Sequence, residues 1–90
     1  AGGMIFHTAD TLAEIHRICK KHEILFIADE IATGFGRTGN MFACNEAGIT
    51  PDVLCLGKAL TGGAITMAAT LASEEVFTSF LSDDPEHAFM

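Results

Sequence analysis

Two short apolar runs in this chain each end in a charged residue, and this feature constrains the fold more than any other. Residues 24–28 read ILFIA and lead into Asp29, whereas residues 53–56 read VLCL and lead through Gly57 into Lys58. Apolar runs without alternation are typical of strands that are buried on both faces, as in a parallel sheet. Because ligands bind beyond the carboxyl ends of strands in open α/β sheets, we predict that the two opposite charges face one crevice.

A helix is predicted before the first apolar run. Residues 8–23 carry apolar side chains at helical spacing, among them Leu12 and Ile15. Thr11, followed three residues later by Glu14, predicts a capping box at the start of this helix.

The segments around the second run predict a loop, a strand and a helix. Residues 33–41 are rich in glycine and predict a loop, and a third strand is expected within residues 64–73. Ser73 predicts the cap of a helix over residues 74–81. Helix, strand, loop and strand in this order indicate an α/β layered domain.

The charge balance excludes several classes of partner. The 90 residues contain five Lys or Arg against twelve Asp or Glu, which gives a net charge of −7. A nucleic-acid interface needs a basic face, and so does binding to an anionic membrane surface. The sequence therefore predicts neither a nucleic-acid partner nor a membrane partner.

The cysteines and the ends of the chain carry further expectations. Three widely spaced cysteines without a Cys-x-x-Cys pair predict reduced thiols in a cytoplasmic protein, and no metal site. No apolar run approaches the roughly 20 residues that a membrane span needs. The chain opens without an initiator methionine and stops without a closing element, so we expect it to be a piece of a longer protein.

The residues around Lys58 favour covalent chemistry over a simple ion pair. A lysine acts as a nucleophile only when its amine is deprotonated. Gly57 and the small residues that follow Lys58 leave space for a flat ring beside that amine. Pyridoxal phosphate is a flat cofactor that binds to a lysine, and its ring nitrogen needs a carboxylate partner. Asp29 is the candidate for that carboxylate.

The stretch that carries both charges resembles a known family. Residues 25–63, LFIADEIATGFGRTGNMFACNEAGITPDVLCLGKALTGG, are similar to the class III, or ω-type, pyridoxal-phosphate aminotransferases of fold type I, and most of all to their biotin-pathway branch. The resemblance implies that residues 1–90 are part of the large, cofactor-binding domain, with a mainly parallel sheet, of an obligate homodimer. It also implies that the 90 residues alone are inactive.

The resemblance assigns a role to each candidate site residue. Lys58 would bind the cofactor covalently and move the proton in catalysis, and Asp29 would bond the ring nitrogen. Ile31 would pack on the ring face, and Arg37 would lie on the substrate side. Ala32 departs from the broader family, where many members carry glutamine. The biotin-pathway branch implies S-adenosylmethionine as amino donor and 7-keto-8-aminopelargonate as acceptor.

Two other hypotheses stay open at this point. The chain could belong to another ω-aminotransferase with a different amine substrate, or to a non-catalytic α/β binding module in which Asp29 and Lys58 pair directly. Residues 34–39, GFGRTG, fit a dinucleotide-binding fingerprint, but five residues separate them from the strand and no long helix follows. We expect these glycines to allow tight turns and close backbone approach, and Glu30 to brace their loop.

Overall fold

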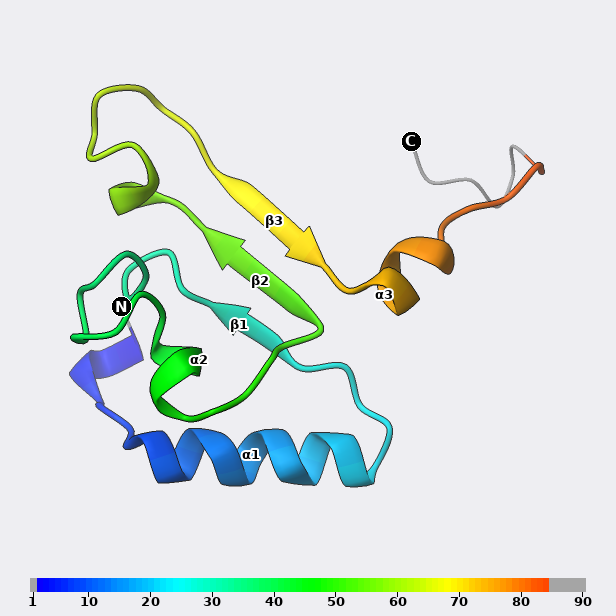
Figure 1. The fold of residues 1–90 in the computed structure, drawn as a ribbon, viewed down its shortest axis with the longest axis horizontal. Helices are drawn as coiled ribbons and strands as arrows, with labels where there is room; N and C mark the ends of the chain where they lie inside the picture. The colour runs from blue at the N-terminus through cyan, green and yellow to red at the C-terminus, as the bar shows by residue number, and fades with distance from the viewer. Residues whose placement is uncertain (1, 85–90) are drawn as a thin grey trace.

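A three-stranded sheet organises the structure, a computed structural model that describes residues 2–84 (Figure 1). The elements in chain order are η1 (Gly2–Met4), α1 (Ala9–Lys21), β1 (Ile27–Asp29), α2 (Ala43–Glu46), β2 (Val53–Leu56), η2 (Lys58–Leu60), β3 (Ala69–Ala72) and α3 (Glu74–Thr78). None of the helices within residues 2–84 has the length and apolar character of a membrane-spanning segment.

The pairing of the strands confirms the predicted parallel strand pair. Strands β1 and β2 are parallel, with Ile27 opposite Val53 and Asp29 opposite Cys55. Strand β3 pairs with β2 in the antiparallel direction, so the sheet is mixed. Because β1 and β2 run the same way, Asp29 at the end of β1 and Lys58 just beyond β2 lie at the same edge of the sheet.

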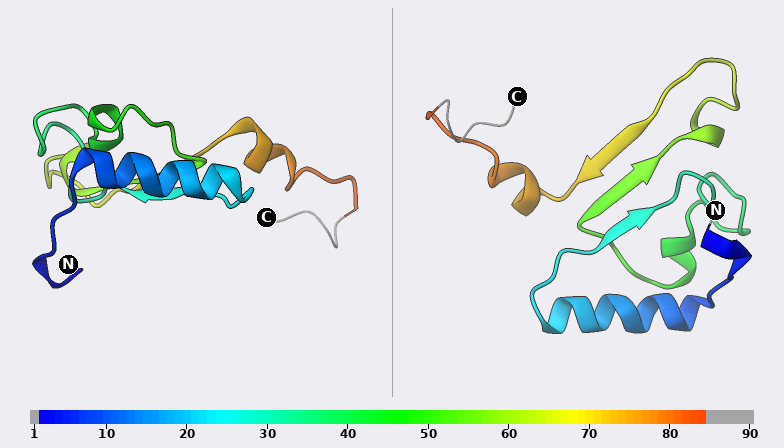
Figure 2. Two further views of the ribbon diagram at one scale, coloured as in Figure 1. Left: turned by 90° about the horizontal axis from the view of Figure 1, so that it is seen from below. Right: turned by 180° about the vertical axis from the view of Figure 1, so that it is seen from behind.

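The packed core lies between α1, α2 and β1. Phe26, Ala28 and Cys44 are buried together, and four partly buried residues pack against them: Leu12, Cys19, Ile49 and Leu54. Figures 1 and 2 show α1 and α2 on the β1 side of the sheet, whereas α3 stands apart from both. The core is therefore one-sided within residues 2–84.

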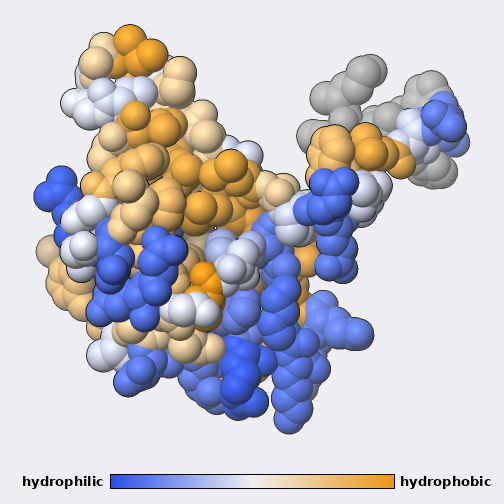
Figure 3. Space-filling model, in the orientation of Figure 1, coloured by the Kyte–Doolittle hydropathy of each residue, from blue (hydrophilic) through white to orange (hydrophobic). Residues whose placement is uncertain are grey.

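Much of the apolar surface of the sheet is left uncovered by residues 2–84. Ile27 is 62% exposed and Leu71 is 52% exposed, although both lie in strands. Figure 3 shows apolar residues gathered over the sheet and its β3 side, whereas the α1 side is mostly hydrophilic. Exposed apolar patches of this kind are typical of surfaces that contact other protein or a ligand.

The helix caps correct one prediction and confirm another. The cap of α1 is Thr8, whose hydroxyl accepts a hydrogen bond from the Thr11 backbone N–H at 3.2 Å. The predicted capping box of Thr11 and Glu14 is wrong, because the helix already begins at Ala9; Glu14 pairs with Arg17 instead, at 2.6 Å. Ser73 caps α3 as predicted, through the Val76 backbone N–H.

Asp52 is hydrogen-bonded to three parts of the fold, which are α1, the residue before β1 and the cap of α3. Its carboxylate accepts hydrogen bonds from the Lys20 amine of α1 at 2.6 Å and from the Phe26 backbone N–H at 2.8 Å. Its backbone carbonyl accepts from the Ser73 N–H at 2.8 Å. The hydrogen bond from Lys20, followed by that from Phe26, lowers the pKa of the buried Asp52 carboxyl. Asp52 thereby sets where α1, β1 and β2 meet.

We expect Asp52→Ala to lower the free energy of unfolding of the intact protein by about 1–3 kcal/mol, because the Phe26 N–H would lose its buried acceptor. Lys20→Ala is the matched control: Lys20 is half exposed, and such pairs contribute less than about 1 kcal/mol. Chemical denaturation measures both. Equal losses in the two variants would contradict a role for Asp52 toward the backbone.

Candidate functional site

A hollow of about 420 Å³ lies at the edge of the sheet where β1 and β2 end. Its lining comes from the loop after β1 and from the turn after β2, and consists of Ile31, Ala32, Arg37, Lys58, Ala59, Gly62 and Gly63. Three of the four predicted site residues, Lys58, Ile31 and Arg37, therefore meet here. The fourth, Asp29, does not line this hollow.

Lys58 reaches the hollow through a sharp change of backbone direction. Gly57 is buried and extended, whereas Lys58 is exposed and adopts φ +41°, a left-handed conformation that is uncommon outside glycine. The short turn η2 follows at once, held by a hydrogen bond of 2.9 Å from the Leu60 N–H to the Gly57 carbonyl. The chain thus leaves the sheet at the residue that carries the amine.

Ile31 packs directly against the backbone before Lys58. A Cβ atom placed on Gly57 would lie 3.2 Å from Ile31 Cγ2, which is closer than ordinary side-chain packing allows. Glycine at position 57 therefore lets the Ile31 side chain approach the lysine from one side. On the Lys58 side of the hollow, Ala59, Gly62 and Gly63 carry nothing larger than a methyl group. These residues fit a flat ring beside the Lys58 amine.

Asp29 lies at the end of β1 with an exposed side chain. Its Oδ1 accepts a hydrogen bond from the Ile31 backbone N–H at 3.0 Å. Within residues 2–84 no ion pair joins Asp29 to Lys58. Asp29 and Lys58 therefore do not form the direct ion pair that the hypothesis of a non-catalytic module expects.

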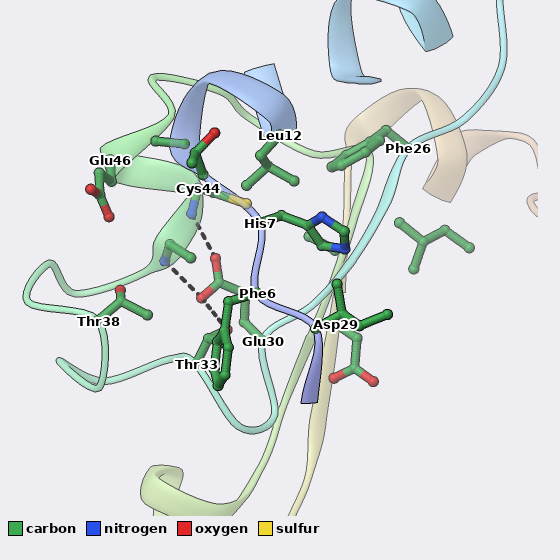
Figure 4. Close-up of a pocket in the computed structure, with 16 residues that line it drawn as sticks. Phe6, His7, Leu12, Phe26, Asp29, Glu30, Thr33, Thr38, Cys44 and Glu46 are labelled. Carbon is green, nitrogen blue, oxygen red and sulfur yellow. Dashed lines mark hydrogen bonds between the residues drawn. The ribbon is translucent and has the colours of Figure 1, made fainter. Parts of the chain in front are cut away.

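Asp29 borders a second cavity, of about 400 Å³, which Figure 4 shows in close-up. The walls of this cavity are largely apolar and come from residues 5–9, β1 and α2. Phe6 and His7 of the N-terminal segment contribute to it. Sequence patterns gave no sign of this cavity, because it depends on where the segment before α1 lies relative to β1 and α2.

Glu30 is the most buried ionisable residue near the site, with 2% of its surface exposed. Its carboxylate accepts hydrogen bonds from the Thr33 hydroxyl at 2.9 Å and from the Ala43 and Cys44 backbone N–H groups, both at 2.8 Å. Figure 4 shows this carboxylate directed at the start of α2, whereas that of Asp29 points away from it. The expectation that Glu30 braces the glycine-rich loop is confirmed.

The environment of Glu30 determines two pKa values. Burial opposes its ionisation, but the Cys44 and Ala43 N–H groups and the Thr33 hydroxyl outweigh burial and lower the pKa of Glu30. Burial, and then the Glu30 carboxylate, raise the pKa of the Cys44 thiol to about 12. Near pH 7 the Cys44 thiol therefore stays protonated, and the Glu30 carboxyl stays ionised.

The role of Glu30 toward α2 was missed by sequence reasoning. The residue before α2 is Phe42, which makes no side-chain capping hydrogen bond. A short helix without a capping residue leaves backbone N–H groups in need of an acceptor. That absence is the signal in the sequence, and Glu30, 13 residues upstream, provides the acceptor.

A comparison with protein families identifies the class of protein. The family model for class III aminotransferases matches residues 1–90. The chain belongs to the class III aminotransferase family, as the resemblance of residues 25–63 indicated.

Individual relatives narrow the comparison within this family. Over 83 residues, 92% of this chain, it is 52% identical to the adenosylmethionine-8-amino-7-oxononanoate aminotransferase of Staphylococcus aureus. The enzyme of the same name from Mycobacterium leprae is 53% identical over 84% of this chain. These matches cover 18% and 17% of the two relatives, so the chain spans about a fifth of their length.

Solved structures confirm the fold. An aminotransferase from Bacillus anthracis superimposes on 96% of this chain and 19% of its own, with a TM-score of 0.88 and 29% identity. The acetylornithine aminotransferase of Elizabethkingia anophelis covers 79% of this chain and 18% of its own, with a TM-score of 0.76 and 44% identity. The α/β piece therefore has the architecture of the aminotransferase family.

We expect Glu30→Gln to lower the free energy of unfolding of the intact protein by about 1–3 kcal/mol near pH 7, because glutamine cannot accept all three hydrogen bonds. The pKa of Glu30 is lowered in the folded state. Its contribution is therefore fully present above the ordinary glutamate pKa of about 4.3 and is lost as the pH falls through the lower folded value.

The stability difference between the intact wild-type protein and Glu30→Gln should accordingly shrink in acid. Denaturation at a series of pH values measures it, with Glu46→Gln, an exposed site on α2, as the control near zero. A difference that stays constant from about pH 7 to pH 3 would contradict the assignment.

Proposed function

We propose that these residues are part of the cofactor-binding domain of a pyridoxal-phosphate-dependent aminotransferase of biotin biosynthesis. The amino donor is S-adenosylmethionine, the acceptor is 7-keto-8-aminopelargonate, and the product is 7,8-diaminopelargonate. The observation that carries the proposal is the hollow in which Lys58, Ile31 and Arg37 meet, in a chain that belongs to the class III family. The names of relatives about 50% identical to the chain support the choice of substrates.

Each residue of the site has a distinct task in this proposal. When bound, the cofactor supplies an electron sink for the carbon that carries the amine. Lys58 would hold the cofactor through its amine, and this amine would accept the proton from that substrate carbon. Ile31 forms one wall of the hollow and keeps the ring in place. The Asp29 carboxylate, which ends β1 at the same edge of the sheet but lies outside the lining of the hollow, would hold the ring nitrogen in its protonated form.

Arg37 is proposed to bind substrate. It lines the hollow together with Lys58, and a guanidinium group recognises a carboxylate through two parallel hydrogen bonds. Both proposed substrates carry a carboxylate. We therefore assign Arg37 to the carboxylate of one of them.

The proposal also covers the assembly. The exposed strand residues Ile27 and Leu71 support a larger domain that covers the sheet. From the family resemblance we also propose a homodimer whose active sites lie at the subunit interface. The three cysteines of the described chain are free, which fits the reduced thiols of a cytoplasmic enzyme. The 90 residues alone are proposed to be inactive, because they span about a fifth of the length of the relatives they match.

Two substitutions test the roles of the charged pair. Lys58→Ala should abolish turnover in the intact protein together with the absorbance of covalently bound cofactor. Asp29→Asn should retain that absorbance but lose turnover by about 10²- to 10⁴-fold, the usual range for a group that controls a proton. Steady-state kinetics and absorbance spectra measure both. Unchanged turnover in Asp29→Asn would show that this carboxylate does not serve the ring nitrogen.

Growth of a biotin auxotroph tests the substrate. The intact gene should restore growth to a strain that lacks the transaminase of biotin synthesis, and the same gene with Lys58→Ala should not. If the wild-type protein is well expressed and transaminates other amines but does not support growth, the enzyme is a different ω-aminotransferase.

A further inference from the structure

The segment that carries Arg37 is a closed loop with a fixed base. We define the Arg37 loop as residues 31–42, between β1 and α2. Its first residue, Ile31, packs against Gly57, and Arg37 also lines the hollow around Lys58. The position of this loop therefore determines what faces the Lys58 amine.

Glu30 fixes the base of the Arg37 loop on both sides. Its carboxylate holds Thr33 near the start of the loop and the Ala43 and Cys44 N–H groups just after its end. Its backbone N–H donates to the Cys55 carbonyl of β2 at 3.0 Å. One buried residue thus joins both ends of the loop to the strand that leads into Lys58.

Packing inside the loop transmits this constraint toward Arg37. The Gly34 N–H donates to the Glu30 carbonyl, and a Cβ atom on Gly34 would lie only 2.9 Å from that oxygen. The rings of Phe35 and Phe42 meet edge to face at 5.5 Å. The Phe35 N–H also donates to the Met41 carbonyl at 2.6 Å. The Gly36 N–H donates to the same carbonyl at 3.3 Å, so residues 37–40, which include Arg37, lie between the two sides of this closed neck.

We propose that Glu30 is a positioning residue for Arg37, and that it sets how far the guanidinium reaches into the hollow beside Lys58. The role of Arg37 toward substrate rests on the proposed function. Without the carboxylate, three donors at the base lose their acceptor and the neck of the loop loosens. Misplacement of a binding group by about 1 Å is enough to weaken productive binding strongly.

The alternative is that Glu30 only stabilises α2. Both readings predict a less stable variant, so stability alone does not separate them. They differ in kinetics, because a positioning residue acts through Arg37 whereas a purely structural residue does not. The test therefore combines a readout of the loop with a double-mutant cycle.

Hydrogen exchange of the intact protein reads out the loop without any catalysis. In Glu30→Gln, amides of residues 33–44 should exchange at least about tenfold faster, since the loop base opens more often, whereas those of α1 stay unchanged. Glu46→Gln is the control and should exchange like the wild type. Unchanged exchange in residues 33–44 of Glu30→Gln would overturn the proposal.

The kinetic cycle compares Glu30→Gln, Arg37→Ala and the double variant at a temperature where all are folded. Arg37→Ala should raise KM for one substrate, and Glu30→Gln should raise KM for the same substrate about tenfold, with kcat within about threefold. The double variant should match Arg37→Ala alone, because the two residues act as one unit. Thr33→Val removes only one of the three hydrogen bonds and should raise KM by a smaller factor. If Glu30→Gln does not fold, Thr33→Val replaces it in the cycle.

Three kinetic results would overturn the proposal: no change of KM in Glu30→Gln, no change of KM in Arg37→Ala, or independent effects that multiply in the double variant. Failure of the proposed function looks different. In that case the wild-type protein would show no transamination at all or would act only on other amines, and the exchange measurement would still decide whether Glu30 holds the Arg37 loop.

Discussion

The parallel pairing of β1 with β2 is the interaction on which the rest of the structure depends. It places Asp29 opposite Cys55 and so brings the ends of both strands to one edge of the sheet. The loop after β1 and the turn after β2 then meet there, and the hollow around Lys58 is the space between them. If the two strands were antiparallel, their carboxyl ends would lie at opposite edges and no such site would form.

Two buried, ionised carboxylates stabilise this arrangement. Asp52, the residue before β2, accepts hydrogen bonds from Lys20 of α1 and from Phe26, the residue before β1. Glu30 joins the end of β1 to α2 and to its own loop. Each carboxylate accepts from a side-chain donor and from at least one backbone N–H group, and buried backbone N–H groups need such an acceptor. The polar contacts therefore fix the ends of the strands, while the small apolar core holds α1 and α2 on β1.

Much of this could be predicted from the sequence, and the failures have physical causes. The unbroken apolar runs and the charges after them predict the strand pair and the common edge of Asp29 and Lys58. The wrong cap of α1 arose because Thr8 and Thr11 have equal capping propensity, and only the start of the helix at Ala9 separates them. The contacts of Glu30 with α2 span 13 and 14 residues, and local patterns do not report contacts at that distance.

We propose that pyridoxal phosphate binds in the hollow at this edge, on the amine of Lys58. Reduction of the intact protein with borohydride in the presence of the cofactor, followed by digestion and mass spectrometry, tests this proposal. We expect the added cofactor mass on the peptide that contains Lys58. Its absence there, or its appearance only on another lysine such as Lys20 or Lys21, would show that the cofactor does not bind to Lys58.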